Sequence, residues 1–157
     1  LLLALGRHGL VGQYLDHVGV HLPFHFGGAV LAETFVAMPF LVLTVEAAFR
    51  STDRRFEDAA RTLGASRLSV FRRVTLPMIR PSLVAGALLC WARALGEFGA
   101  TITFAGNAPG KTQTLPLFVY VTLEGANSDA AIILSLVLVA VSLAVLVALR
   151  DRWLTAL

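Results

Sequence analysis

The chain has 157 residues, of which 57% are apolar and only 15% are charged, whereas about a quarter of the residues in a soluble domain are charged. Its formal net charge is +3 and its mean hydropathy is +0.76. Intrinsic disorder is excluded because it requires low hydrophobicity, and a disulfide scaffold because the chain has one cysteine, Cys90. Nucleic-acid-binding domains are basic but rarely this apolar. An integral membrane protein is the class that remains.

The chain begins inside an apolar run, residues 1–5, which is too short to cross a bilayer. Residue 1 is Leu, no basic stretch precedes the run, and no small-residue cleavage site follows it, so it is not a signal peptide. We expect residues 1–6 to be the end of a truncated span. The chain is then expected to be the C-terminal part of a larger protein.

Three later stretches are long enough to cross a membrane, namely residues 28–49, 81–104 and 130–149. At 1.5 Å per residue, each covers roughly 30 Å, the thickness of the hydrocarbon core. A buried core helix could account for one such stretch, but three in so short a chain favour membrane spans. The expected fold class is therefore an all-α integral membrane protein, a polytopic helical bundle.

The segments between these spans differ in charge. Residues 50–80 hold eight arginines, at positions 50, 54, 55, 61, 67, 72, 73 and 80, against three acidic residues. Because positive residues gather in cytoplasmic loops, we expect residues 50–80 and the tail 150–157 to be cytoplasmic. Segments 7–27 and 105–129 then lie outside, the second with a short helix, and residues 1–157 form one partial transmembrane domain.

The 50–80 loop shows a helical pattern of its own. Its apolar residues Phe56, Ala59, Ala60 and Leu63 fall at i, i+3, i+4 and i+7, which predicts one helical stripe. Residues 51–53 can cap the start of this helix, and Gly64 can end it in a left-handed conformation. A second short helix fits residues 67–74, and Pro77 begins the next element. A basic amphipathic pair of helices lying on the membrane surface is the alternative interpretation.

The spacing over residues 58–77 resembles the EAA loop of bacterial ABC import permeases, Glu-Ala-Ala, three residues, Gly, nine residues, Ile, one residue, Leu-Pro. Asp58 stands for Glu and Val74 for Ile, and the other motif positions match. The resemblance implies a bundle of the binding-protein-dependent ABC permease type, whose loop docks two short helices on an ATP-hydrolysing subunit. The residues implied in this coupling are Glu57, Asp58, Ala59, Ala60, Gly64, Val74, Leu76 and Pro77.

Residues 91–107, 110–116 and 6–12 are similar to the molybdate-type permease subunits, and sulfate permeases share a related Arg-x-x-Gly-Glu-Phe-Gly block. The resemblance implies a permease of the bacterial plasma membrane that imports an oxyanion, molybdate, with sulfate or thiosulfate as the alternative. Its implied partners are an ABC ATPase subunit that binds the ATP, a periplasmic or lipoprotein anion-binding protein, a second permease copy and membrane lipid. No cofactor, catalytic residue, metal or nucleic acid is implied.

Charged residues inside the second predicted span form a second candidate site. Arg93 and Glu97 lie at i and i+4, and a charge at this depth costs a few kcal/mol unless it is paired or faces an interior. The pair can line an anion pathway or its gate, together with Thr101 and Thr103. The alternatives are an ion pair with no ligand contact, and hydroxyls bonded to their own backbone. Other classes kept open are an intramembrane enzyme that uses this pair and a membrane scaffold.

Three further sequence patterns resemble functional sites but lack the residues that such sites require. Residues 106–112 look like a phosphate-binding loop, but three residues instead of four separate the two glycines. His17, His21 and His25 have helical spacing, but Pro23 interrupts any such helix and no carboxylate is spaced to join them, so no metal site is expected. Cys90 has no partner and is expected to be an inert thiol.

Overall fold

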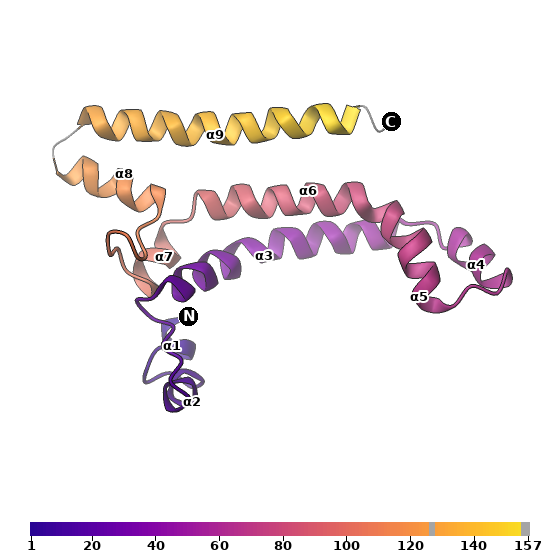
Figure 1. Ribbon diagram of the computed structural model, residues 1–157, viewed down its shortest axis with the longest axis horizontal. Coiled ribbons are helices and arrows are strands. Elements are labelled where there is room, and N and C mark those ends of the chain that lie inside the picture. The colour runs from indigo at the N-terminus through magenta and orange to yellow at the C-terminus, as the bar shows by residue number, and fades with distance from the viewer. Residues whose placement is uncertain (126–127, 155–157) are drawn as a thin grey trace. The chain divides into compact units, whose positions relative to one another are not determined.

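The computed structural model describes the backbone of residues 1–125 and 128–154, and the side chains of these residues as far as residue 147 (Figure 1). Its helices are α1 (Leu2–Leu5), α2 (Gly12–His17), α3 (Phe26–Ser51), α4 (Arg55–Thr62), α5 (Arg67–Val70), the π-helical turn η1 (Phe71–Thr75), α6 (Leu76–Leu95), α7 (Gly99–Phe104), α8 (Leu115–Glu124) and α9 (Ser128–Leu154). The described residues contain no strand, which confirms the expected all-α class. The chain divides into two compact units, residues 37–91 and residues 1–36 with 92–157.

Three helices in the described part of the chain are long and apolar enough to cross a membrane. They are α3, a continuous helix over Arg67–Leu95, and residues Ser128–Val147 of α9. Most of their side chains are not buried against the rest of the chain. Large exposed apolar residues include Phe35, Met38 and Leu43 on α3 and Ile133, Leu136 and Leu143 on α9. Because water-soluble monomers rarely expose so much contiguous apolar surface, these helices suit a lipid environment or contact with further helices.

In the unit of residues 37–91, the C-terminal part of α3 packs on α6. Gly86 on α6 makes this close approach possible, because a Cβ there would lie 3.0 Å from Leu41 Cδ1 and 3.1 Å from Thr44 Cβ. Ala48 of α3 and Ile79 of α6 are buried in the same unit. Small residues at a helix–helix contact let two backbones approach closely in a membrane protein.

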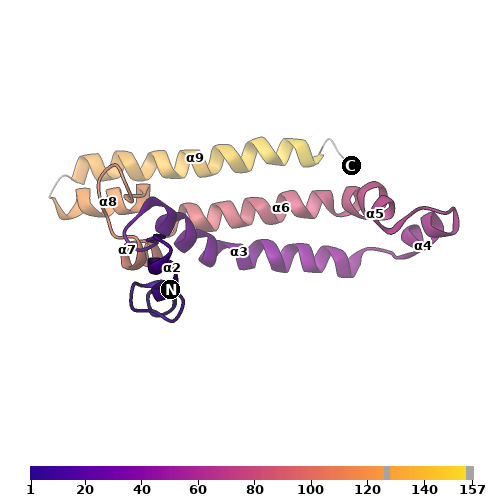
Figure 2. The same ribbon diagram turned by 60° about the horizontal axis from the view of Figure 1, so that its bottom comes forward.

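The helix that follows Ser66 continues without interruption to Leu95, which differs from the prediction that Pro77 begins a separate element. Figures 1 and 2 show α5 running directly into α6. The π turn explains the continuity: the backbone N–H of Leu76 donates to the carbonyl of Phe71, five residues earlier. A widened turn relieves the clash that the ring of Pro77 would otherwise make with the preceding turn. The two loop helices are therefore not equivalent, because only α5 extends a membrane-length helix.

The second apolar stretch, predicted as one span over residues 81–104, is interrupted in the structure. The helix ends at Leu95, residues 96–98 are not helical, and α7 begins at Gly99. Gly96 is a poor helix former, and the side chain of Glu97 takes over a backbone hydrogen bond at the start of α7. Hydropathy alone does not reveal this break, because residues on both sides of it are apolar.

In the unit of residues 1–36 and 92–157, the core lies around α7 and α8. Phe104 and Leu117 are fully buried, and Ala105 and Ala131 are buried with them. α8 packs against α9, and the rings of Phe98 and Tyr120 meet edge to face with centroids 5.1 Å apart. α9 continues through residues 150–154 of the predicted tail, whereas residues 155–157, and residues 126–127 of the predicted loop 105–129, lie outside the described residues.

Candidate functional site

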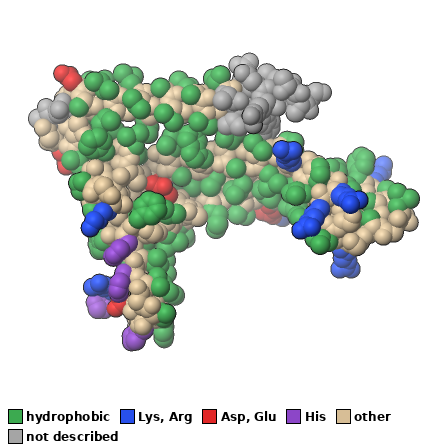
Figure 3. Space-filling view, viewed as in Figure 1, with side chains coloured by type: hydrophobic (Ala, Val, Ile, Leu, Met, Phe, Trp, Pro, Cys, Tyr) green, Lys and Arg blue, Asp and Glu red, His purple; other side chains and the backbone are tan. Residues whose placement is uncertain are grey.

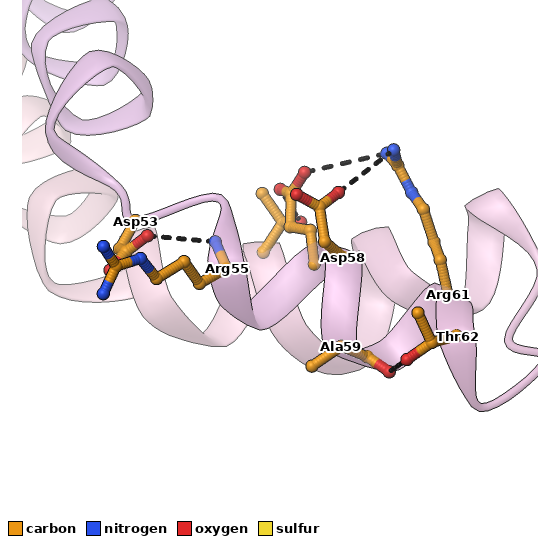
Figure 4. Close-up of polar contacts among 8 residues, drawn as sticks. Asp53, Arg55, Asp58, Ala59, Arg61 and Thr62 are labelled. Atoms are coloured by element: carbon orange, nitrogen blue, oxygen red, sulfur yellow. Dashed lines mark hydrogen bonds and ion pairs between the residues drawn. The ribbon is translucent and has the colours of Figure 1, made fainter.

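The predicted side-chain cap of α4 among residues 51–53 is wrong, because the N-cap is Arg54, which makes no side-chain cap hydrogen bond. The residue just before that N-cap is Asp53. Its carboxylate accepts a hydrogen bond of 2.9 Å from the backbone N–H of Arg55 (Figure 4). Of the three residues predicted to cap this helix, the other two act elsewhere: the hydroxyls of Ser51 and Thr52 donate to the carbonyl of Ala48, at the end of α3. An acidic side chain at a helix N-terminus also interacts favourably with the helix dipole.

The end of α4 is a Schellman turn centred on Gly64. The backbone N–H of Gly64 donates to the carbonyl of Arg61 at 2.9 Å, and that of Ala65 donates to the carbonyl of Ala60 at 3.1 Å. Gly64 has φ +83°, the left-handed conformation predicted from the sequence. The hydroxyl of Ser66 then caps α5 by accepting from the N–H of Ser69. The chain therefore reverses between α4 and α5 through a short turn whose backbone hydrogen bonds are defined.

Most of the apolar stripe of α4 is exposed, and only Ala60 of its four residues is half-buried. Phe56 is exposed, Leu63 is 89% exposed, and no residue of α4 is buried. On the neighbouring helix, Leu68 and Phe71 are exposed as well. Figure 3 shows Arg side chains around this same α4–α5 segment. The segment thus offers exposed apolar side chains within a basic rim (Figure 3).

The two adjacent acidic residues of α4 lie in different surroundings. The Asp58 side chain is 69% exposed, whereas that of Glu57 is 22% exposed. Arg61 lies 3.8 Å from a carboxylate oxygen of each, and Figure 4 shows it reaching Asp58. These three residues help to line a hollow of about 400 Å³ that also involves Phe49, Thr52 and Arg54.

The other oxygen of Glu57 joins α4 to the helix that follows it. Glu57 Oε1 accepts a hydrogen bond of 2.6 Å from the hydroxyl of Thr75, which is 5% exposed and lies in the π turn. The sequence analysis missed Thr75, because the two residues are 18 positions apart and nothing in the local pattern pairs them. A polar residue between the predicted motif positions Val74 and Leu76 was the only available signal.

The structure distributes the predicted coupling residues over two segments. Residues 57–64 lie on α4 and in its turn, and residues 74–77 lie at the junction of η1 and α6. Most of these residues are exposed, namely Asp58, Ala59, Gly64, Leu76 and Pro77, while Glu57, Ala60 and Val74 are half-buried. The packing of α4 on η1 brings the two segments into one surface region.

Arg93 and Glu97 form an ion pair beside the break between α6 and α7. Arg93 Nη1 lies 2.7 Å from Glu97 Oε2, and Glu97 Oε1 accepts a hydrogen bond of 2.8 Å from the N–H of Ala100. The Glu97 side chain is 6% exposed and that of Arg93 is 38% exposed. Glu97 therefore has both oxygens engaged within the chain, while Arg93 retains further N–H donors.

The two threonines of the same candidate site differ. The hydroxyl of Thr103 donates to the carbonyls of Gly99 and Ala100, which is the alternative that the sequence analysis kept open. The hydroxyl of Thr101 is buried and has no hydrogen-bond partner among the described residues. The structure thus brings Arg93 and Glu97 together and binds Thr103 to its own helix.

The phosphate-loop-like segment and the three histidines make hydrogen bonds or ion pairs with residues nearby in the sequence. Within residues 106–112, the hydroxyl of Thr112 accepts from the N–H of Ala108, which closes a turn. The expectation that no carboxylate joins the histidines is wrong for His21, which lies 2.7 Å from Asp16 because the loop after α2 folds back on it. His17 and His25 bond to nearby backbone carbonyls. The described residues contain no group of three or more His, Cys, Asp or Glu side chains placed to hold a metal ion.

Comparison with known proteins places this arrangement in a family. The model of the family described as "Binding-protein-dependent transport system inner membrane component" matches residues 9–157. The chain is 47% identical over 152 residues to the molybdenum transport system permease protein ModB of Mycobacterium bovis, which covers 97% of this chain and 57% of that protein.

Two further relatives extend the comparison. The molybdenum transport system permease protein ModB of Escherichia coli K12 is 41% identical over 157 residues, 98% of this chain and 67% of that protein. Sulfate permease 2, chloroplastic, of Chlamydomonas reinhardtii is 43% identical over 146 residues, 93% of this chain and 40% of that protein. The chain thus spans little more than half the length of its Mycobacterium relative, and it belongs to the family of binding-protein-dependent transport system inner membrane components.

Proposed function

We propose that this chain is part of the permease subunit of an ATP-driven importer for an oxyanion, and that the anion is molybdate. The observation that carries the proposal is the identity of 41–47% to permeases named for molybdenum transport over nearly the whole chain. Sulfate or thiosulfate is the second candidate, because sulfate permeases are 39–43% identical over 88–93% of the chain. A transport role requires no catalytic residue or cofactor in this subunit, because ATP is bound and hydrolysed by a partner.

The α4–α5 segment is the proposed docking site for that ATPase subunit. Its exposed apolar residues Phe56 and Leu63, together with the exposed carboxylate of Asp58, give it the mixed surface that protein interfaces use. The helix from Arg67 to Leu95 supports the proposal mechanically, since a movement of the docked segment is carried directly along one helix of membrane-spanning length. An external anion-binding protein and a second permease copy complete the proposed transporter.

The Arg93–Glu97 pair is proposed to border the anion pathway. Arg93 supports this role, because it keeps part of its side chain exposed and its guanidinium has donors beyond the one facing Glu97. The competing role is purely structural, with the pair joining the end of α6 to the start of α7. An Arg93→Gln variant separates the two: we expect loss of anion uptake with the protein still in the membrane, and unchanged uptake would assign the pair to the structural role.

Uptake of labelled molybdate tests the proposed function. Cells without their own molybdate permease would express the full-length protein with its ATPase and binding-protein subunits. We expect ATP-dependent uptake that unlabelled molybdate abolishes and a large excess of sulfate leaves unchanged. Sulfate competition that is as strong as molybdate competition would transfer the assignment to a sulfate permease. Absence of uptake of both anions, or failure to co-purify an ATPase subunit, would favour the enzyme or scaffold alternatives.

A further inference from the structure

The neighbouring residues Glu57 and Asp58 present their carboxylates to different environments, which suggests different tasks. The Asp58 side chain is 69% exposed and lies 3.8 Å from Arg61. Glu57 instead turns toward η1 and accepts the 2.6 Å hydrogen bond from buried Thr75. Among the described residues, this is the one hydrogen bond between side chains that belong to different helices. Asp58 is thus available to a partner, whereas Glu57 is engaged inside the chain.

The hydrogen bond matters because α4 has few other attachments. None of its residues is buried, so apolar packing contributes little to holding it in place. The helix is connected to α5 through the Gly64 turn, whose hydrogen bonds lie within the backbone of residues 60–65. A turn of this kind fixes the direction of the chain but does not itself hold the N-terminal end of α4 against η1, and that end joins α3 only through residues 52–54. Glu57, which lies in the first turn of α4, restrains that end.

The π turn supplies the partner for Glu57. Because a π turn inserts one residue into an α-helix, it shifts the side chains on one side of it by about 100° relative to those on the other. Thr75 is the last residue of this turn and is buried, whereas its neighbours Leu76 and Pro77 are exposed. A hydrogen bond from a hydroxyl to a carboxylate is among the stronger ones in proteins, because the acceptor is charged.

We propose that Glu57 and Thr75 form a latch that fixes α4 on the helix Arg67–Leu95, so that a load applied to α4 moves that helix instead of bending the loop. The inference rests on the proposed function as a permease, and it assigns to both residues a positioning role. Glu57 then belongs to the internal support of the docking surface and Asp58 to the surface itself.

Variants of Thr75 test the latch in the complete transporter and in the isolated full-length protein. Thr75→Val removes the hydroxyl at nearly constant shape, and Thr75→Ser restores it. Thr62→Val is the matched control, because the Thr62 hydroxyl donates to Ala59 within α4 and does not cross to η1. We expect Thr75→Val to speed amide hydrogen exchange in α4 about tenfold, with Thr75→Ser and Thr62→Val close to the parent protein.

In the transporter, the expected effect of Thr75→Val is a change in coupling. The number of ATP molecules hydrolysed per molybdate imported should rise about threefold or more, while ATP hydrolysis itself continues. Glu57→Ala should behave like Thr75→Val, and the double variant should be no worse than either single one, because both remove the same hydrogen bond.

Two outcomes separate the latch from the proposed function. If Thr75→Val matches Thr62→Val both in α4 exchange and in ATP consumed per molybdate, the latch is overturned. If the parent transporter imports no anion, the proposed function fails, and the exchange measurement still decides whether Glu57 and Thr75 hold α4 in place.

Discussion

At the scale of single residues, Gly64 determines where the α4–α5 segment turns. Its φ of +83° belongs to a region that L-residues with a Cβ disfavour, and both hydrogen bonds of the Schellman turn depend on that conformation. A Cβ at Gly64 would meet no other atom within 4 Å. The requirement for glycine is therefore conformational and not one of space.

Replacing Gly64 by Ala should cost about 1 kcal/mol of local stability, because the side chain is strained in the left-handed conformation but meets no clash. Native-state hydrogen exchange of the α4 amides, measured on the full-length protein, should then be about fivefold faster. Gly27→Ala is the control, since Gly27 lies in α3 and has equally open surroundings. Equal behaviour of the two variants would show that the turn does not limit α4.

At this scale, the sequence predicted local features better than those that depend on tertiary contact. A cap among residues 51–53 and an end at Gly64 were expected for α4, because capping and left-handed glycine follow from neighbouring residues. The end at Gly64 was confirmed, whereas the N-cap is Arg54. Thr75 was not expected, because its partner Glu57 is brought near only when α4 folds back on η1. The orientation of the α4 stripe was equally undetermined, since a stripe of apolar residues does not say which surface covers it.

At the scale of helices, the close contact between α3 and α6 depends on a glycine, which has no side chain to separate the two helices. Gly86 lies against Leu41 and Thr44, at distances that already place a Cβ in tight contact. Leu41 Cδ1 ends a flexible side chain and can shift, whereas Thr44 Cβ is attached directly to the backbone of α3 and moves only with the helix. The backbone of α6 at Gly86 therefore lies close to α3.

We expect Gly86→Leu to separate α3 from α6 and to destabilise the folded protein by about 1–3 kcal/mol, the usual effect of overpacking a well-packed contact. Thermal unfolding of the detergent-solubilised full-length protein measures this loss. Gly96→Leu is the comparison, because Gly96 has open space around it. If both variants melt at the same temperature, Gly86 does not determine how closely α3 and α6 pack.

The helix boundaries show which signals hydropathy carries and which it lacks. Three apolar stretches of membrane length were predicted, and the part of the chain that the structure describes contains three helices of that kind. Their ends differ most in the second stretch, where the helix begins at residue 67 and ends at Leu95. The early start depends on the π turn before Pro77, and the early end on Gly96 and Glu97. Both are hydrogen-bonding features that an average over apolar residues does not register.

At the scale of the whole molecule, charge is concentrated in a single loop. Residues 50–80 carry eight of the 13 Lys and Arg residues, and the segments on the other side of the predicted spans carry few. The positive-inside rule then orients the α4–α5 segment toward the cytoplasm, the side on which the proposed ATPase subunit would dock. This orientation remains a prediction from the charge distribution.

Cysteine labelling of intact cells tests the orientation. Arg67 and Lys111 are both basic and exposed, so each can be replaced by Cys in a full-length Cys90→Ala background. A membrane-impermeant maleimide should label Lys111→Cys in intact cells and Arg67→Cys only after permeabilisation. The reverse pattern would invert the orientation and would place the α4–α5 segment out of reach of a cytoplasmic partner.

The Arg93–Glu97 pair has a consequence for how the chain is made. A lone charge in the middle of a segment adds about 2.5–3.5 kcal/mol to the cost of inserting it into the bilayer during synthesis. Here Arg93 lies in the last turn of α6 and Glu97 in the break that follows it, four residues further along the same apolar stretch and 2.7 Å away. The segment can therefore neutralise its own charge as it leaves the translocation channel, before α9 has been synthesised. Correct insertion of this segment then depends on the order of its own residues and not on the arrival of a later helix.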